Sequence, residues 1–332
     1  MMKKGLLYTY NTVAPFLYRH EGVQKKMSVK SSKNSILLFV AAIIWGVAFV
    51  AQSAGMDYVG PFTFNAVRSL LGGVVLIPCV CLLNRINSRQ TDSARNSAMP
   101  KDRPKDLLIG GLACGFLMFV STSLQQVGIM YTTVAKAGFI TALYIIMVPI
   151  LGIFLKRKAG LKIWISVLIA VVGLYLLCMK GSFSISKGDF LILLCSLTFA
   201  MHIMVVDYFT EKVSGTKLSC IQFLFAGGLS AVLMFLYEEP KLSSICAAWL
   251  PIAYAGILSC GVAYTFQIIG QRGTDPTIAS LILSLESVIS VLAGWVLLGE
   301  KLSARELTGC VLMFAAILLA QINPKQFLKK KL

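Results

Sequence analysis

The stretch Gln267–Glu300, QIIGQRGTDPTIASLILSLESVISVLAGWVLLGE, decides the fold. Most of it is a run of apolar and small residues, which one carboxylate, Glu286, interrupts. A bilayer core about 30 Å thick needs about 20 such residues in one α-helix, so we expect this run to span a membrane. Asp275 and Pro276 predict the start of that helix. Asp can accept a hydrogen bond from a free amide, and Pro lacks only an amide that would be unpaired there.

The same pattern occurs 142 positions earlier in the chain. Gln267 corresponds to Gln125, and Glu286 corresponds to Tyr144. The other matched pairs are Gly270 and Gly128, Thr274 and Thr132, Ala279 and Ala137, Leu285 and Leu143, and Gly294 and Gly152. Matches at one fixed offset predict a repeated unit whose two copies share a scaffold and differ in their polar groups.

The composition indicates an integral membrane protein. Of the 332 residues, 57% are hydrophobic and only 14% are charged, which is far from the balance of a water-facing surface. The net charge of +17 comes from short Lys and Arg clusters between apolar runs, so it does not predict a nucleic-acid partner. The nine Cys residues lack metal-ligand spacing, and no metal or cofactor is expected.

Ten apolar runs have about the length of a membrane span. They cover residues 35–54, 62–83, 107–129, 134–155, 161–180, 188–209, 217–236, 248–270, 277–298 and 304–322. Gly60-Pro61 predicts a helix start before the second run, and capping-box spacing predicts helix starts at Ser186 with Asp189 and at Ser303 with Glu306. A cytoplasmic N-terminus places 24 of the 31 Lys and Arg residues inside, which predicts that both termini are cytoplasmic.

Five spans per repeat is an odd number, so the second repeat enters the membrane from the opposite side. We therefore predict an all-α membrane protein with ten transmembrane helices in two inverted five-helix repeats, at 35–180 and 188–322. Residues 1–34 are predicted to be a basic, disordered cytoplasmic tail, and residues 323–332 a second basic cytoplasmic tail. Inverted repeats are typical of secondary transporters, whose sites lie near the membrane midplane between the halves.

The chain resembles the EamA-like transporters of the drug/metabolite transporter superfamily over nearly all of residues 35–322. The resemblance lies in Trp45-Gly46, AVRSLLGG with Arg68, QQVGIMYTTVAKAGFITALYIIMVPILG with Gln125 and Pro149, and SLESVISVLAGWVLLGEKLS with Glu286 and Glu300. It implies transport of small metabolites through a central cavity lined mainly by helices 3, 4, 8 and 9. Where many members have Glu-Pro in the ninth helix, this chain has Glu286-Ser287, so a proline kink is not predicted there.

Glu286 is the strongest candidate site residue. An acid near the membrane centre costs about 2.5–3.5 kcal/mol on insertion scales, so it should face protein or water. It could be a substrate counter-ion, a proton-coupling site or a structural carboxyl bonded to a neighbouring helix. Tyr144 could meet a ligand of mixed polarity or simply pack.

Four further residues each have more than one interpretation. Gln125 and Gln267 could line the cavity from both halves or bond between helices. Arg68 could extend to the outer interface, pair structurally or bind an anionic group. Lys136 is predicted to be an interfacial anchor rather than a substrate contact.

We therefore predict a secondary active transporter, not an enzyme. It would move an amino-acid-like, amphipathic or drug-like metabolite across the cytoplasmic membrane by alternating access, with proton coupling as an option. The alternative is a polytopic membrane enzyme acting on a lipid-like or small substrate. The expected partners are a small-molecule substrate and the lipid bilayer, and a homodimer is compatible with the sequence.

Overall fold

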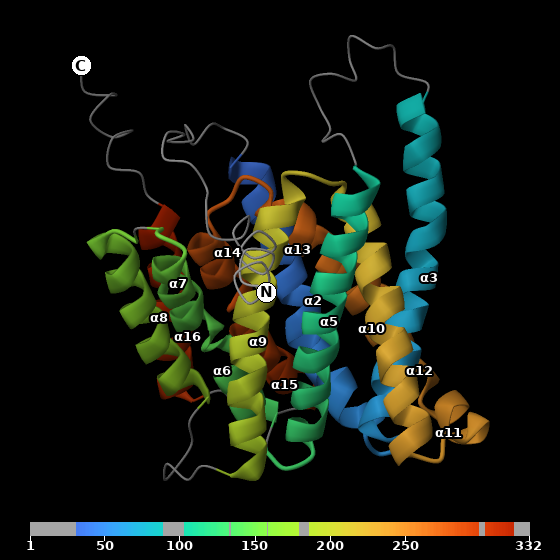
Figure 1. Cartoon of the computed structure of the whole chain (residues 1–332). Coiled ribbons are helices and arrows are strands. Elements are labelled where there is room, and N and C mark those ends of the chain that lie inside the picture. The colour runs from blue at the N-terminus through green and yellow to red at the C-terminus, as the bar shows by residue number, and fades with distance from the viewer. Residues whose placement is uncertain are drawn as a thin grey trace, which may run out of the picture.

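The computed structural model describes residues 31–88, 103–132, 134–157, 159–178, 186–298 and 303–321, and every element there is helical (Figure 1). In chain order the elements are α2 (Ser31–Gly55), α3 (Pro61–Ser88), α5 (Pro104–Ile129), α6 (Val134–Ala142), α7 (Tyr144–Phe154), α8 (Leu161–Cys178), α9 (Lys187–Thr210), α10 (Gly215–Tyr237), α11 (Leu242–Ala247), α12 (Trp249–Ala253), the π-helix η1 (Tyr254–Ala263), α13 (Tyr264–Gln271), α14 (Pro276–Leu283), α15 (Glu286–Leu298) and α16 (Ala304–Gln321). Apart from residues 31–34, which open α2, the predicted tails lie outside the described residues, as does Glu300.

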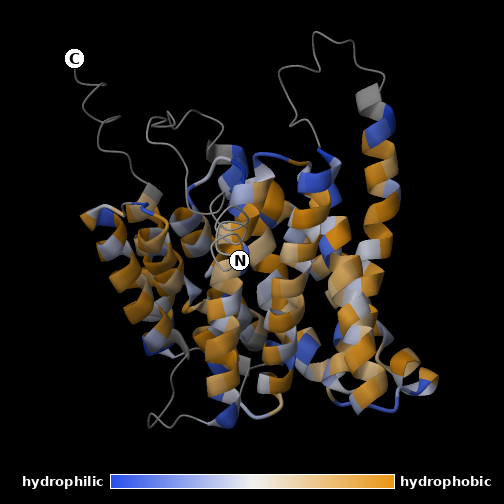
Figure 2. Cartoon of the chain, viewed as in Figure 1, coloured by the Kyte–Doolittle hydropathy of each residue, from blue (hydrophilic) through white to orange (hydrophobic). Residues whose placement is uncertain are grey.

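The chain is a multi-pass membrane protein. Eight helical segments of the described chain are long and apolar enough to cross a bilayer, and α8 contains a shorter apolar helix. Figure 2 shows hydrophobic residues through the middle of the bundle and hydrophilic residues gathered toward its two ends. That distribution is expected when side chains in the middle of each helix meet hydrocarbon.

The predicted helix starts are confirmed. Asp275 accepts hydrogen bonds from the amides of Thr277 and Ile278, at 2.9 and 3.3 Å, and α14 begins at Pro276. A reciprocal capping box joins Ser186 to Asp189 at the start of α9. The same arrangement occurs before α16, between Ser303 and Glu306, and α3 begins at the predicted Pro61. These caps satisfy amides that no intrahelical partner reaches.

Two of the membrane-spanning segments are interrupted at repeat-related positions. The α6–α7 segment breaks at Leu143, and the α14–α15 segment breaks at Ser284 and Leu285. No proline kink was predicted for α14–α15, and the segment breaks without a proline. The Ser284 hydroxyl bonds to the Leu281 carbonyl at 2.8 Å at this break, but Ser280 and Ser290 make the same kind of bond within α14 and α15 without interrupting them. Pro149 lies within α7, beyond the first break.

The two broken helices cross the molecule in opposite directions, since α6 leads up to α7 in Figure 1 whereas α14 leads down to α15. The turn before α14 contains Gly273 at φ 81°, a left-handed conformation that glycine adopts without steric cost. Elsewhere glycines permit close packing. A Cβ on Gly111 of α5 would lie 2.4 Å from Ile221 of α10, so the glycine of the GLACG sequence at residues 111–115 lets these two helices pack closely.

Candidate functional site

A buried cavity lies where the two broken helices meet the helices around them. It contains about 490 Å³ of empty space, counting the part that is open to solvent. Its lining residues come from the whole length of the chain, and they are Trp45, Ala48, Phe49, Gln52, Arg68, Gln125, Thr141, Tyr144, Phe199, Ile203, Ser259, Tyr264, Gln267, Leu283 and Glu286. All five residues that the sequence singled out are among them. The cavity thus collects polar groups that lie up to about 240 positions apart in the sequence.

Glu286 and Tyr144 contact each other inside this cavity. Glu286 is the first residue of α15 and Tyr144 is the first residue of α7, so each follows a helix break directly. The Tyr144 hydroxyl donates a hydrogen bond to Glu286 Oε1 at 3.1 Å, and the two residues are 5% and 3% exposed. The sequence aligned these two positions through the repeat but did not predict that their side chains would touch.

The two glutamines also reach the cavity, with different partners. Gln125 donates from Nε2 to the Thr141 hydroxyl at 3.2 Å, and it also lines the cavity. Its two predicted roles, a bond between helices and a place in the cavity wall, therefore hold at the same time. Gln267 lies on α13, and its Oε1 is buried without a hydrogen-bond partner. An unsatisfied buried acceptor costs about 1–3 kcal/mol, and a donor on a bound molecule could relieve that cost.

Arg68 lies inside the protein, so of its interpretations the extension to the outer interface is excluded, while structural pairing and anion binding remain. It is 3% exposed, and its Nε donates to Asn65 Oδ1 at 2.9 Å. Its guanidinium also lies over the Phe64 ring, 5.4 Å from the ring centroid. These contacts hold one edge of the guanidinium, while Nη2 is buried without a hydrogen-bond partner. Arg68 and Glu286 both line the cavity but do not form an ion pair with each other.

Sequence reasoning missed several cavity residues on helices outside the expected set. The third, fourth, eighth and ninth spans, which are α5, α6–α7, η1–α13 and α14–α15, contribute as the resemblance implied. Residues of α2, α3 and α9 line the cavity as well. Trp45 was not among the candidate site residues, yet its Nε1 is buried without a partner, as is Oε1 of Gln52. The two residues are seven positions apart on α2, a spacing that places both on one face. A polar Gln within an apolar span was the available signal for this face.

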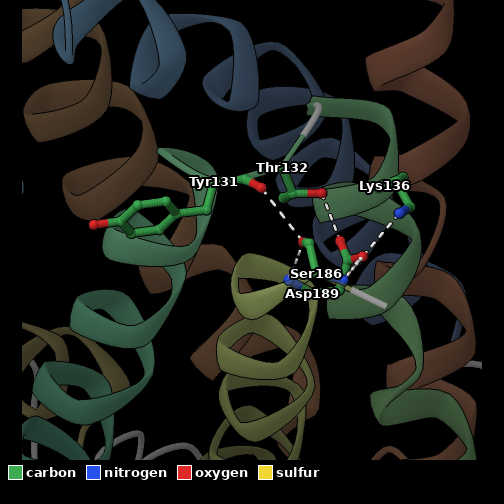
Figure 3. A network of polar contacts seen from close by, with 5 residues as sticks. All are labelled: Tyr131, Thr132, Lys136, Ser186 and Asp189. Atoms are coloured by element: carbon green, nitrogen blue, oxygen red, sulfur yellow. Dashed lines mark hydrogen bonds and ion pairs between the residues drawn. The ribbon is translucent and has the colours of Figure 1, made fainter. Parts of the chain in front are cut away.

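A second polar network lies away from the cavity, where the α5–α6 turn meets the start of α9 (Figure 3). The Asp189 carboxylate accepts from the Thr132 hydroxyl at 2.6 Å and from Lys136 Nζ at 2.8 Å. Ser186 donates from Oγ to the Tyr131 carbonyl at 3.3 Å and from its amide to Asp189 Oδ2 at 2.8 Å. Lys136 therefore ties α6 to α9, a role more specific than the predicted interfacial anchor.

Comparisons with known proteins agree with this architecture. The EamA-like transporter family matches residues 33–179 and 186–321. An "Uncharacterized transporter" of Archaeoglobus fulgidus is 28% identical over 296 residues, covering 89% of this chain and 88% of the relative. The "Uncharacterized inner membrane transporter YedA" of Escherichia coli K12 is 26% identical over 293 residues, covering 85% and 88%.

One solved structure, titled "Crystal structure of protein", shares the fold. It superposes with a TM-score of 0.70 at 18% sequence identity, covering 87% of this chain and 96% of the other. At that identity the likeness concerns the arrangement of helices alone.

Proposed function

Because the chain belongs to the EamA-like transporter family, we propose that it is a secondary active transporter of a small organic molecule, working by alternating access in the cytoplasmic membrane. The observation that carries this proposal is the buried cavity lined from both halves of the chain, with Tyr144 and Glu286 meeting at the two helix breaks. Relatives named as transporters support transport in general. A substrate contacted by both halves can be released to either side when the halves rock against each other.

The proposed topology has ten spans in two inverted repeats. Each broken helix counts as one span, and so does the continuous path from α12 through η1 to α13. The 18-residue helices α8 and α16 complete the ten, since 18 residues extend about 27 Å. The opposite directions of the two broken helices in Figure 1 support the inversion. The charge distribution supports cytoplasmic termini.

Proton coupling through Glu286 is part of the proposal. It is a buried acid in the cavity, with one carboxylate oxygen bonded to Tyr144 and no cation paired with it in the described chain. A group that exchanges a proton at this place could link substrate release to a proton gradient.

Reconstitution of the full chain into lipid vesicles tests the function. Counterflow of at least one member of a metabolite panel, without formation of any product, is the expected result and would exclude the alternative of a membrane enzyme. Coupling predicts that an imposed pH gradient drives accumulation by the wild type but not by Glu286→Gln. Chemical conversion of a panel compound without its movement would overturn the proposal.

A further inference from the structure

The broken span α6–α7 is tied to α9 by two ion pairs. Lys136, in the first turn of α6, pairs with Asp189 at 2.8 Å (Figure 3). Arg157, which follows α7, pairs with Asp207 at 2.6 Å. The two acids are 18 residues apart on α9, a separation of about 27 Å along a helix. The two ion pairs therefore lie near opposite surfaces of the membrane.

The break at Leu143 lies between these ion pairs. It divides the span into two arms, α6 with Lys136 and α7 followed by Arg157, and each arm has its own tie to α9. In an unbroken helix, releasing one end would displace the other, because the backbone hydrogen bonds hold both ends in one rod. A break between the ties lets one arm leave α9 while the other stays in place.

The turn after α7 places Arg157 for its contact with α9. It follows the Schellman pattern, because the Lys156 amide donates to the Ile153 carbonyl at 2.9 Å and the Arg157 amide donates to the Gly152 carbonyl at 2.8 Å. Lys156 has a φ of 57°, in the left-handed region where glycine is usual and a lysine is strained. Strain of this kind persists where surrounding contacts hold it, and here the next residue is bonded to α9.

Each ion pair combines a buried acid with a partly exposed cation. The side chains of Asp189 and Asp207 are 4% and 7% exposed, whereas those of Lys136 and Arg157 are 23% and 31% exposed. A buried carboxylate is costly without a partner, so each pair favours the arm that lies against α9. A partly exposed cation regains water easily, so each pair can also be broken and formed again.

The seam between α9 and the two arms leads to the cavity. Thr141 of α6 and Tyr144 of α7 line the cavity on one side of this seam, and Phe199 and Ile203 of α9 line it on the other. An arm that moved away from α9 would therefore open a path between the cavity and the membrane surface at which that arm ends.

From this arrangement we propose that the two ion pairs are latches, each of which closes the cavity toward its own face. Release of Lys136 from Asp189 opens the outer face through α6, and release of Arg157 from Asp207 opens the cytoplasmic face through α7. The inference rests on the proposed function and its topology, and it names the contacts that control access from each side.

Labelling of a cysteine in the cavity tests the latches. Ser259→Cys is placed in the full chain without native cysteines, because Ser259 lines the cavity from η1 and is 3% exposed. A membrane-impermeant maleimide reaches it from outside in intact cells and from the cytoplasmic side in inside-out vesicles. Lys136→Met should speed labelling in cells alone, and Arg157→Met in inside-out vesicles alone, each by roughly threefold or more.

Controls separate a latch from a tie that only stabilises the fold. Arg272→Gln removes an exposed cation of the turn before α14, outside both ion pairs, and should leave both labelling rates unchanged. Asp207→Asn should act like Arg157→Met, and the exchange of charges in Arg157→Asp with Asp207→Arg should restore slow labelling. Folded variants whose melting temperature falls while labelling stays unchanged, or speeds equally from both sides, would overturn the inference.

The latches and the proposed function can fail separately. Labelling that changes on the expected side for each variant, in a chain that shows no counterflow of any panel compound, would uphold the latches and refute the transporter. Counterflow by the same chain, with labelling that neither substitution alters, would refute the latches and leave transport intact.

Discussion

The Tyr144 hydroxyl donates a hydrogen bond to the carboxylate of Glu286, a residue 142 positions later that occupies the equivalent place in the repeated sequence. Each of the two residues begins the second segment of a broken helix. The contact thus joins α7 to α15 at their first residues, beside the cavity.

Tyr144→Phe removes that hydrogen bond and keeps the ring. A hydrogen bond to a charged group contributes about 1.5–3 kcal/mol, so we expect transport to slow by roughly tenfold or more while folded yield stays near normal. Counterflow in vesicles measures the change. Tyr131→Phe is the matched control, because Tyr131 is exposed and does not line the cavity. Equal rates for the two variants would remove the Tyr144 hydroxyl from the transport mechanism.

The elements of the fold could be predicted from the sequence because their causes are local. Span length, the Asp275 cap and the two capping boxes all depend on residues within a few positions of one another. The break in α14–α15 was missed since proline was the expected cause. At this break the hydroxyl of Ser284 bonds to the carbonyl three residues before it. The presence of a serine in a span does not by itself predict whether the helix breaks there.

The candidate site was predictable as a set of residues but not as a geometry. Rare polar residues in apolar spans pointed to Glu286 and Arg68, because such residues are costly in lipid. The direction of the Arg68 side chain depends on Asn65, and Asn65 is oriented by Thr122 on another helix. Contacts of that kind between distant segments have no signature in a single sequence. Trp45 was missed as well, because tryptophan is as common at packing positions as at binding sites.

The orientation of the chain is tested by cysteine labelling with a membrane-impermeant maleimide. On a background without native cysteines, Ser88→Cys and Ala159→Cys should react only after the membrane is permeabilised, because the charge distribution places both on the cytoplasmic side. Ser243→Cys in α11 is the opposite-side control and should react in intact cells, since its residue is exposed in the structure. Labelling of Ser88→Cys and Ala159→Cys in intact cells would reverse the proposed topology.

The Asp189 network should stabilise the fold more than a surface ion pair does. Asp189 is 4% exposed, caps α9 and accepts from both Thr132 and Lys136. Asp189→Ala should lower the free energy of unfolding by about 1–3 kcal/mol, because it removes the cap and leaves partly buried donors unpaired. Lys136→Met should cost less, since the Lys136 side chain is 23% exposed and the cap survives.

Thermal unfolding in one detergent compares these two variants with Asp57→Asn, a substitution at an exposed acid in the turn before α3. We expect the highest melting temperature for Asp57→Asn, a lower one for Lys136→Met and the lowest for Asp189→Ala. A Lys136→Met protein that melts below Asp189→Ala would contradict this account, because Asp189→Ala removes the ion pair as well as the cap.

A close contact between α2 and α15 gives the last prediction. Gly46 lies on α2 next to Trp45, and a Cβ added there would lie 2.5 Å from the Ile289 Cβ and 2.7 Å from the Glu286 carbonyl oxygen. The backbone cannot accept that methyl group without moving α2 away from α15. Gly46→Ala should therefore destabilise the protein by about 1–3 kcal/mol, the usual cost of overpacking, and should reduce transport by displacing Trp45 and Glu286. Gly228→Ala in α10 is the matched control, because nothing lies within 4 Å of its added Cβ and alanine favours the helix. Melting temperature and vesicle counterflow are measured for both variants. A Gly46→Ala protein as stable and active as Gly228→Ala would mean that α2 and α15 are not packed as closely in the membrane as they are in the structure.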